Sequence, residues 1–201
     1  MKRVLILVTA IAAICAITLT AAAADLYHTV NKGDTMWKIA SHYKVGTKEV
    51  IDANQQIKNP DLIYPGDVLA IPQLSTNITS RESQLVILVN EIRAKNGLPP
   101  LTENWQLSRV ARYKSQDMAD NNYFSHNSST YGSPFQMMKQ FGITYRSAGE
   151  NIAQGYSSAH AVINAWMNSP GHRANILNPS YTQIGVGYTS KGHHWTQMFI
   201  G

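Results

Sequence analysis

The sequence predicts an α+β protein made of two modules, a small βααβ unit followed by a larger domain of helices around a few antiparallel strands. Three observations support this prediction. Apolar residues repeat at helical spacing in several separate segments. Short extended runs bounded by Gly or Pro lie at both ends of the first module, and two more close the chain. A polar stretch without an apolar repeat separates the modules, and 201 residues accommodate both.

The composition is that of an ordinary folded protein, with 44% hydrophobic and 14% charged residues. The formal net charge is +5, and two of the basic residues, Lys2 and Arg3, lie in an N-terminal segment that we expect to be removed. This modest excess suits an anionic wall or membrane surface. The sequence has no cluster of basic residues and no nucleic-acid-binding motif, so we expect no nucleic-acid partner.

Residues 1–24 have the organisation of a secretory signal peptide, with a basic end, an apolar core and an A-x-A cleavage site. Cleavage would leave a secreted chain without a stable membrane anchor. An uncleaved anchor is the alternative, because the apolar run is of marginal length for spanning a bilayer. The single cysteine, Cys15, lies in this segment, and Ile14 before it disfavours lipidation. The mature chain would then lack disulfides and a catalytic thiol, which suits an exported bacterial protein.

The first module covers residues 25–72. Its expected elements are a strand, two helices and a strand, at Tyr27–Val30, about Thr35–Tyr43, about Thr47–Asn54 and Val68–Ile71. Asp34 or Thr35 can cap the first helix, because a short oxygen-bearing side chain accepts hydrogen bonds from free backbone N–H groups. So small a core suits a binding module better than an enzyme.

The motifs of this module are V-x-K-G-D-T-M-x-x-I-A, I-x-x-A-N and N-P-D-L-I-Y-P-G-D-V-L-x-I-P. Together they resemble a LysM domain, which implies binding of peptidoglycan or a chitin-like glycan between the loop after the first strand and the loop before the last. The implied glycan-binding residues are Gly33, Asp34, Thr35, Met36, Asn59, Pro60, Asp61, Leu62 and Ile63. The alternative for single residues is structural, with Asp34 and Thr35 capping a helix and Leu62 and Ile63 filling the core.

Residues 73–83 are polar and rich in Ser and Thr, so we expect a linker there. The larger domain follows over residues 84–201. Its expected elements are helices at Glu82–Asn96 and about Glu103–Asn121, the latter capped by Thr102, a short helix at about Pro134–Phe141, a partly extended segment at Ile143–Ala153, a helix capped by Ser157 or Ser158, and strands at Tyr181–Thr189 and His194–Ile200.

Three residues of the larger domain have the character of a chemical site. His126 lies in a loop after a long helix, Glu150 stands between a glycine and an asparagine, and His172 follows a Pro-Gly turn. Two imidazoles and a carboxylate could bind a divalent metal such as zinc. They could equally share protons in general acid–base catalysis. The sequence has neither the HExxH spacing of a zinc protease nor a recognisable Ser-His-Asp spacing, so both alternatives stay open.

These residues also lie in motifs that carry a second resemblance. The motifs are N-x-x-R-x-x-x-G-L-x-P-L at Asn90–Leu101, Y-F-S-H at Tyr123–His126, G-E-N-I-A at Gly149–Ala153, W-M-N-S-P-G-H-R-A-N-I-L at Trp166–Leu177 and I-G-V-G-Y at Ile184–Tyr188. They resemble the CAP superfamily of cysteine-rich secretory, antigen 5 and pathogenesis-related proteins, in its cysteine-free bacterial form. The resemblance implies an α-β-α sandwich whose cleft carries two histidines and two acidic residues, with a zinc or other divalent ion in some members.

His126, Glu150 and His172 match three of the four cleft residues, and the resemblance implies that His126 and His172 are the ligands of any metal. Ser169 stands near the position of the second acidic residue, and a hydroxyl cannot replace a carboxylate as a base. This departure favours binding or assembly over catalysis.

The sequence therefore predicts a secreted protein that binds peptidoglycan in the cell wall or spore envelope and presents a cleft to a protein, peptide or lipid. The architecture resembles that of secreted proteins of spore-forming bacteria, which implies a partner in the envelope or spore coat and a role in coat or cortex assembly or in germination control. Two alternatives remain. One is an envelope hydrolase that uses His126, Glu150 and His172, with or without a metal, and the other is a purely structural protein.

Overall fold

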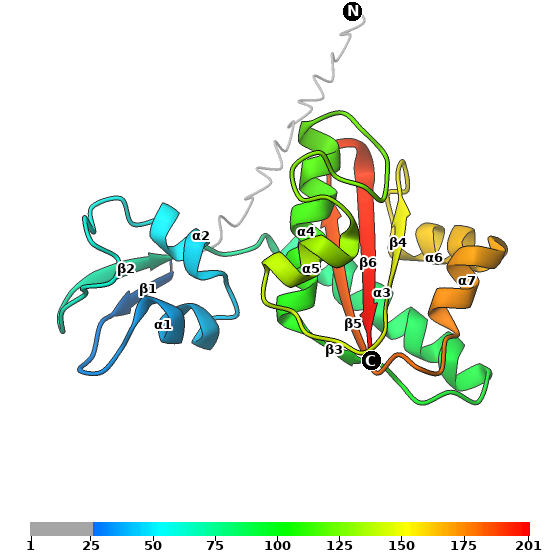
Figure 1. The fold of residues 1–201 in the computed structure, drawn as a ribbon, viewed down its shortest axis with the longest axis horizontal. Helices are drawn as coiled ribbons and strands as arrows, with labels where there is room; N and C mark the ends of the chain where they lie inside the picture. Colours follow the sequence, from blue (N-terminus) through cyan, green and yellow to red (C-terminus); the bar gives the residue numbers. More distant parts are fainter. Residues whose placement is uncertain (1–25) are drawn as a thin grey trace, which may run out of the picture.

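The computed structural model describes residues 26–201. The predicted signal peptide and Cys15 lie outside the described residues. Two folded modules follow one another along the chain (Figure 1). None of the helices in residues 26–201 combines the length and apolarity needed to cross a bilayer.

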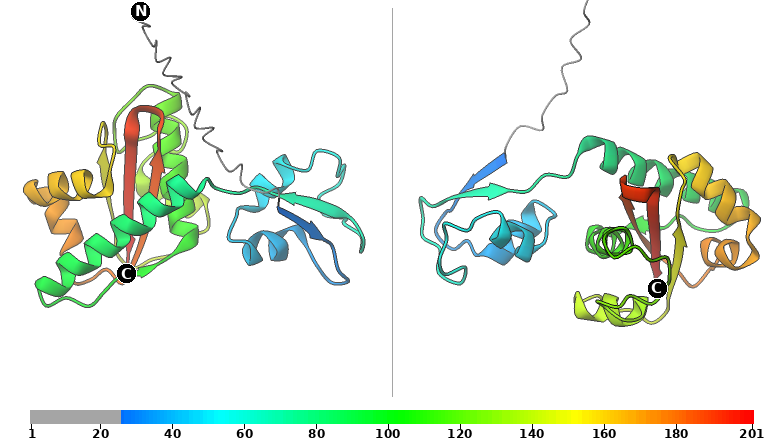
Figure 2. Two further views of the ribbon diagram at one scale, coloured as in Figure 1. Left: turned by 180° about the vertical axis from the view of Figure 1, so that it is seen from behind. Right: turned by 90° about the horizontal axis from the view of Figure 1, so that it is seen from above.

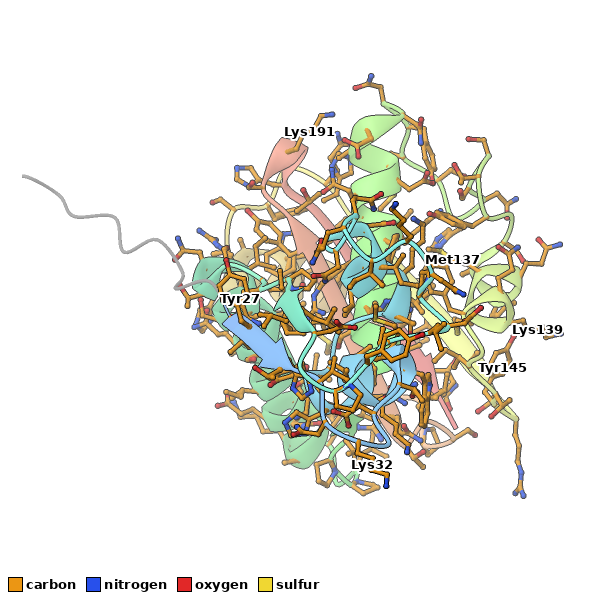
Figure 3. The ribbon with its side chains drawn as sticks, turned by 90° about the vertical axis from the view of Figure 1, so that its left-hand side faces the viewer. Tyr27, Lys32, Met137, Lys139, Tyr145 and Lys191 are labelled. Atoms are coloured by element: carbon orange, nitrogen blue, oxygen red, sulfur yellow. The ribbon has the colours of Figure 1, made fainter. Side chains whose placement is uncertain are left out.

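The first module is a two-stranded antiparallel sheet with two helices, in the predicted βααβ order. Its elements are β1 (Leu26–Thr29), α1 (Met36–His42), α2 (Thr47–Asp52) and β2 (Val68–Ile71). Thr29 at the end of β1 lies opposite Val68 at the start of β2. The loop after β1 and the loop before β2 therefore leave the sheet at the same end. Figure 3 shows this module from its own side, with Tyr27 on β1 and Lys32 in the loop that follows.

Side-chain hydrogen bonds fix the ends of the helices in this module. Thr35 caps α1, as predicted, by accepting a hydrogen bond from the N–H of Lys38. Asp34 does not cap the helix; its carboxylate accepts hydrogen bonds from the backbone N–H of Asn31 and from His28 Nε2. At the end of α2, the buried amide of Asn54 bonds to the carbonyl and to the N–H of Ala70 on β2, both at 2.8 Å. The module is held together by these contacts as well as by its small core.

The second domain is a sheet between two helical layers, which confirms the predicted α+β sandwich. Its elements are α3 (Thr76–Lys95), β3 (Thr102–Glu103), α4 (Trp105–Asp120), α5 (Pro134–Gln140), β4 (Ala148–Ala153), α6 (Ala159–Asn168), α7 (Pro170–Ile176), β5 (Gln183–Thr189), a 3₁₀ turn (Lys191–His193) and β6 (His194–Ile200). The strand order is β3-β5-β6-β4, and only the short β3 runs parallel to its neighbour. Helices α3 and α6 lie on one side of the sheet, and α4 and α5 lie on the other (Figure 2).

The first helix of this domain begins earlier than predicted. Ser75 caps α3, and the helix starts at Thr76, so most of the segment expected to be a linker is helical. The added residues 76–81 have contacts of their own: Ser75 caps the helix, Ile78 packs against the core of the domain, and the Arg81 guanidinium lies over the Tyr188 ring. Glu82, at the start of the predicted helix, is buried, and its carboxylate accepts hydrogen bonds from the Arg112 guanidinium and from the N–H of Tyr188. A mostly polar segment has no apolar repeat, so the sequence pattern did not reveal the added turns.

Two further local predictions were wrong. Thr102 does not cap α4, because Thr102 and Glu103 pair with β5 as the short strand β3, and Asn104 provides the cap instead. His172 does not lie in a tight turn, because Pro170 begins α7 and places His172 in the first helical turn. Proline is well tolerated at this position of a helix, where its missing N–H would have no intrahelical partner.

Helix α4 packs directly against the backbone of β5. A Cβ atom at Gly185 would lie 2.3 Å from the backbone carbon of Leu107, and one at Gly187 would lie 2.1 Å from that of Ala111. Ile184 and Val186 alternate with these glycines and join the core on the other side of the sheet. The I-G-V-G-Y motif is therefore a packing requirement, since only glycines allow α4 to come this close.

We expect Gly187→Ala to lower the free energy of unfolding of the second domain by about 3 kcal/mol, because the added methyl group forces α4 away from the sheet. Urea denaturation followed by circular dichroism measures this change. Gly171→Ala is the matched control, since its Cβ would meet nothing within 4 Å. Equal stabilities of the two variants would contradict the packing argument.

Candidate functional site

Strand β4 lies at an edge of the sheet and brings the candidate residues together. It pairs only with β6, and alternate residues of a strand point to opposite faces of a sheet. Glu150 lies opposite Met198, which belongs to the core against α4 and α5. Asn151 points the other way, and its Nδ2 donates to the carbonyl of His172 at the start of α7. Segments from the two helical layers thus meet at one strand.

His126 and Glu150 form a direct pair. The Nδ1 atom of His126 lies 2.7 Å from Glu150 Oε1. The Glu150 side chain is 1% exposed, whereas that of His126 is 53% exposed. A carboxylate acceptor at Nδ1 favours the tautomer that carries its proton there, which leaves Nε2 free to accept a proton. Burial raises the pKa of Glu150, and the hydrogen bond from His126 opposes this effect.

His172 lies in the same cleft but makes no comparable pair. Its Nδ1 atom is buried and has no hydrogen-bond partner among residues 26–201, and the same is true of Glu150 Oε2. Its ring centre lies 6.3 Å from that of Trp166. Burial lowers the pKa of His172, and the charge of His126 lowers it further. Buried polar atoms of this kind are normally satisfied by water or a ligand.

The cleft is a hollow of about 850 Å³. Its lining includes His126, His172, Ser169, Phe124, Tyr156 and Trp166. Phe124 is 49% exposed and Tyr156 36% exposed, so two aromatic rings face solvent beside the imidazoles. Exposed rings next to polar groups are typical of binding surfaces. Trp166 is buried, whereas Tyr156 could not be placed here from the sequence, because it lies outside the recognised motifs.

The cleft does not fit a three-ligand metal centre. Within residues 26–201, no group of three or more His, Cys, Asp or Glu side chains is arranged to hold a metal ion. The Nδ1 of His126 is bonded to Glu150, so His126 and His172 together offer two nitrogen ligands, fewer than the three of a catalytic zinc site. Metal binding by His126 and His172 stays a prediction.

Ser169 stands near the position at which the resemblance implied a second acidic residue. It lines the hollow at the N-terminus of α7, and its hydroxyl makes no capping hydrogen bond within the described part of the chain. Glu150 is therefore the carboxylate on which acid–base chemistry in this cleft would depend.

The residues predicted to bind glycan have different environments in the first module. Met36 is buried in its core, Ile63 is half-buried, and the backbone of Gly33 has a φ of 91°. Leu62 is 52% exposed. The exposed members of the predicted set are Gly33, Thr35, Asn59, Asp61 and Leu62. Trp37, which is 64% exposed and follows the first loop, was not predicted. Their roles in glycan binding stay predictions.

Comparison with known proteins identifies both modules. Residues 86–200 match the family described as CAP, the cysteine-rich secretory protein family. This chain belongs to the CAP family. Residues 28–72 match the LysM domain, so the βααβ module is a LysM domain in front of a CAP domain.

Relatives from Bacillus cover each part of the chain. The uncharacterised protein YkwD of Bacillus subtilis is 57% identical over 126 residues, which are 63% of this chain and 49% of YkwD. The spore coat assembly protein ExsA of Bacillus cereus is 45% identical over 51 residues, 25% of this chain and 8% of ExsA. The crystal structure of an extracellular SCP-domain protein from Bacillus anthracis matches with a TM-score of 0.60 and 37% identity, over 68% of this chain and 47% of that one. This chain thus spans about half the length of YkwD and of the B. anthracis protein.

We expect acid to destabilise the CAP domain partly through His172. Its pKa in the fold is below the value of 6.5 that applies to the unfolded chain, so the unfolded state takes up protons first as the pH falls. The stabilising contribution is complete above pH 6.5 and is lost as the pH falls through the folded-state pKa. His172→Gln should therefore reduce the loss of unfolding free energy between about pH 7.5 and about pH 5.5.

Urea denaturation at both pH values measures this dependence. His160→Gln, which replaces an exposed histidine of α6, is the control and should behave as wild type. An unchanged pH dependence in His172→Gln would show that His172 does not resist protonation in the fold.

Proposed function

We propose that this protein is secreted to the cell wall or spore envelope, where its LysM domain binds peptidoglycan and its CAP cleft binds a ligand or partner. The observation that carries the proposal is the pairing of a LysM domain with a CAP domain in one chain. The two loops implied in glycan binding leave the same end of the small sheet, and their exposed residues are accessible to a polymer.

A role in spore coat or cortex assembly, or in germination control, is the setting that we propose for this activity. The LysM segment is similar to part of a protein named for spore coat assembly. The CAP hollow, with exposed rings from Phe124 and Tyr156, suits a protein, peptide or lipid of the envelope. In this account the LysM domain fixes the chain to the wall, and the cleft remains open to a partner.

Leu62→Asp should weaken binding to purified peptidoglycan sacculi by about 10-fold or more, because it places a charge in an exposed apolar position of the proposed groove. Co-sedimentation of the mature chain with sacculi measures the dissociation constant. Ile87→Asp is the matched control, since Ile87 is a similarly exposed aliphatic residue on α3 of the CAP domain. A lack of binding by the wild type would refute the proposed function, and equal binding by both variants would move the glycan site away from Leu62.

A second candidate function, hydrolysis of wall material or peptides, is favoured by one specific observation. Glu150 is buried and accepts the Nδ1–H of His126, which is the arrangement that orients a histidine as a general base. His126 Nε2 would take a proton from water, and Glu150 would stabilise the resulting imidazolium ion. Against this function stands Ser169, because the cleft has no second carboxylate that could protonate a leaving group.

Mass spectrometry of peptidoglycan fragments after incubation with the purified protein distinguishes the two candidates. If the protein is a hydrolase, Glu150→Gln should lower the rate by about 10²–10⁴-fold, because it removes the group that orients the base. His160→Gln should retain the wild-type rate. Unchanged fragments in the presence of wild-type protein would argue against hydrolysis and leave the binding role.

A further inference from the structure

A buried lysine on α4 lies behind the cleft. The side chain of Lys114 is fully buried, although lysine is among the residues least often buried completely. Taking an ammonium group out of water is costly unless it is paired and hydrogen-bonded. The pair of His126 and Glu150 does not by itself explain why a lysine is buried at this position.

The contacts of Lys114 lead to the loop that carries His126. Its Nζ atom donates a hydrogen bond of 2.8 Å to the backbone carbonyl of His126 and lies 3.2 Å from the hydroxyl of Tyr123. It also lies 5.1 Å from the centre of the Tyr123 ring. One of these contacts is to the main chain of the candidate base itself, so Lys114 fixes the point from which the imidazole projects.

Asp117, one helical turn further along α4, holds the same loop on both sides of His126. Its carboxylate accepts hydrogen bonds from the hydroxyls of Tyr123, Ser128 and Thr130. These bonds lower the pKa of Asp117 although burial raises it. A lysine and an aspartate of α4 therefore fasten the loop through polar contacts, in addition to the packing of Tyr131 against the apolar core.

The charge of Lys114 is matched by two carboxylates. Burial lowers its pKa, while the nearby negative charges of Glu150 and Asp117 raise it. In turn, Lys114 lowers the pKa of Glu150. The ammonium charge therefore interacts favourably with two carboxylates: that of Asp117, which holds the loop, and that of Glu150, which pairs with His126.

We propose that Lys114 is a positioning residue of the CAP cleft, which holds the main chain of His126 so that its half-exposed ring meets Glu150. The bond from Lys114 to the His126 carbonyl, together with the ties from Asp117, restricts the loop to the geometry in which Nδ1 reaches the carboxylate. This role goes beyond the proposed function, because it applies whether the cleft binds a partner or catalyses hydrolysis.

The test uses the mature chain with ¹⁵N-labelled histidine rings and lysine side chains. In the wild type, NMR should show His126 as the tautomer whose Nδ1 carries the proton that Glu150 accepts. Lys114→Met keeps the length and apolar stem of the side chain but removes the donor and the charge, so we expect this tautomer signature to be lost. Lys114→Arg, which keeps both, should retain it at least in part, and Lys95→Met, at an exposed position of α3, should leave it unchanged.

The signature separates positioning from mere stabilisation, since a folded protein with a loose loop would lose it while the signals of His172 and His194 remain. A folded Lys114→Met protein with an unchanged His126 signature would overturn the proposal. If Lys114→Met does not fold, a measurement on the wild-type protein tests the proposal instead. Slowly exchanging Lys114 ammonium protons with nuclear Overhauser effects to the backbone at residues 126–127 would support the proposal, and their absence would overturn it.

Discussion

The close contact between α4 and the glycines of β5 is the constraint on which the CAP domain depends. Gly185 and Gly187 have no side chains where the backbone of α4 passes, so the helix lies against the sheet itself. The depth of α4 sets where Lys114 and Asp117 are buried, and these two residues set the course of the following loop. Packing that is remote from the cleft therefore determines where His126 lies.

The cleft combines this loop with an edge strand. A strand inside a sheet would have a neighbour on each side, whereas β4 leaves one edge open to segments from both helical layers. The side chain of Glu150 points toward the layer of α4 and α5, and that of Asn151 points toward α7, because neighbouring residues of a strand point in opposite directions. Asn175 on α7 completes the arrangement, with hydrogen bonds from its Nδ2 to the carbonyl of Glu150 and to Asn151 Oδ1. The G-E-N-I-A motif thus both presents a carboxylate and fastens the helix that carries His172.

Much of the fold could be predicted from the sequence because local signals determine it. The order of elements in the LysM domain, the Thr35 cap and the final strand β6 follow from short-range patterns of apolar, capping and turn residues. His126 and Glu150 were also singled out, together with His172, because all three stand in distinctive motifs, although their pairing was not predicted. What the sequence could not show were contacts between distant polar residues. Glu82 is buried against Arg112, thirty positions away, and Lys114 has the appearance of a solvent-facing residue until the loop folds over it.

A high-resolution crystal structure of the mature protein would test the central claim most directly, namely that α4 and the edge strand hold His126 against Glu150. The account predicts a His126 Nδ1 to Glu150 Oε1 distance close to 2.7 Å and a Lys114 Nζ to His126 carbonyl distance close to 2.8 Å. A His126 ring turned to solvent, with Glu150 paired to another group and Lys114 away from the loop, would contradict it.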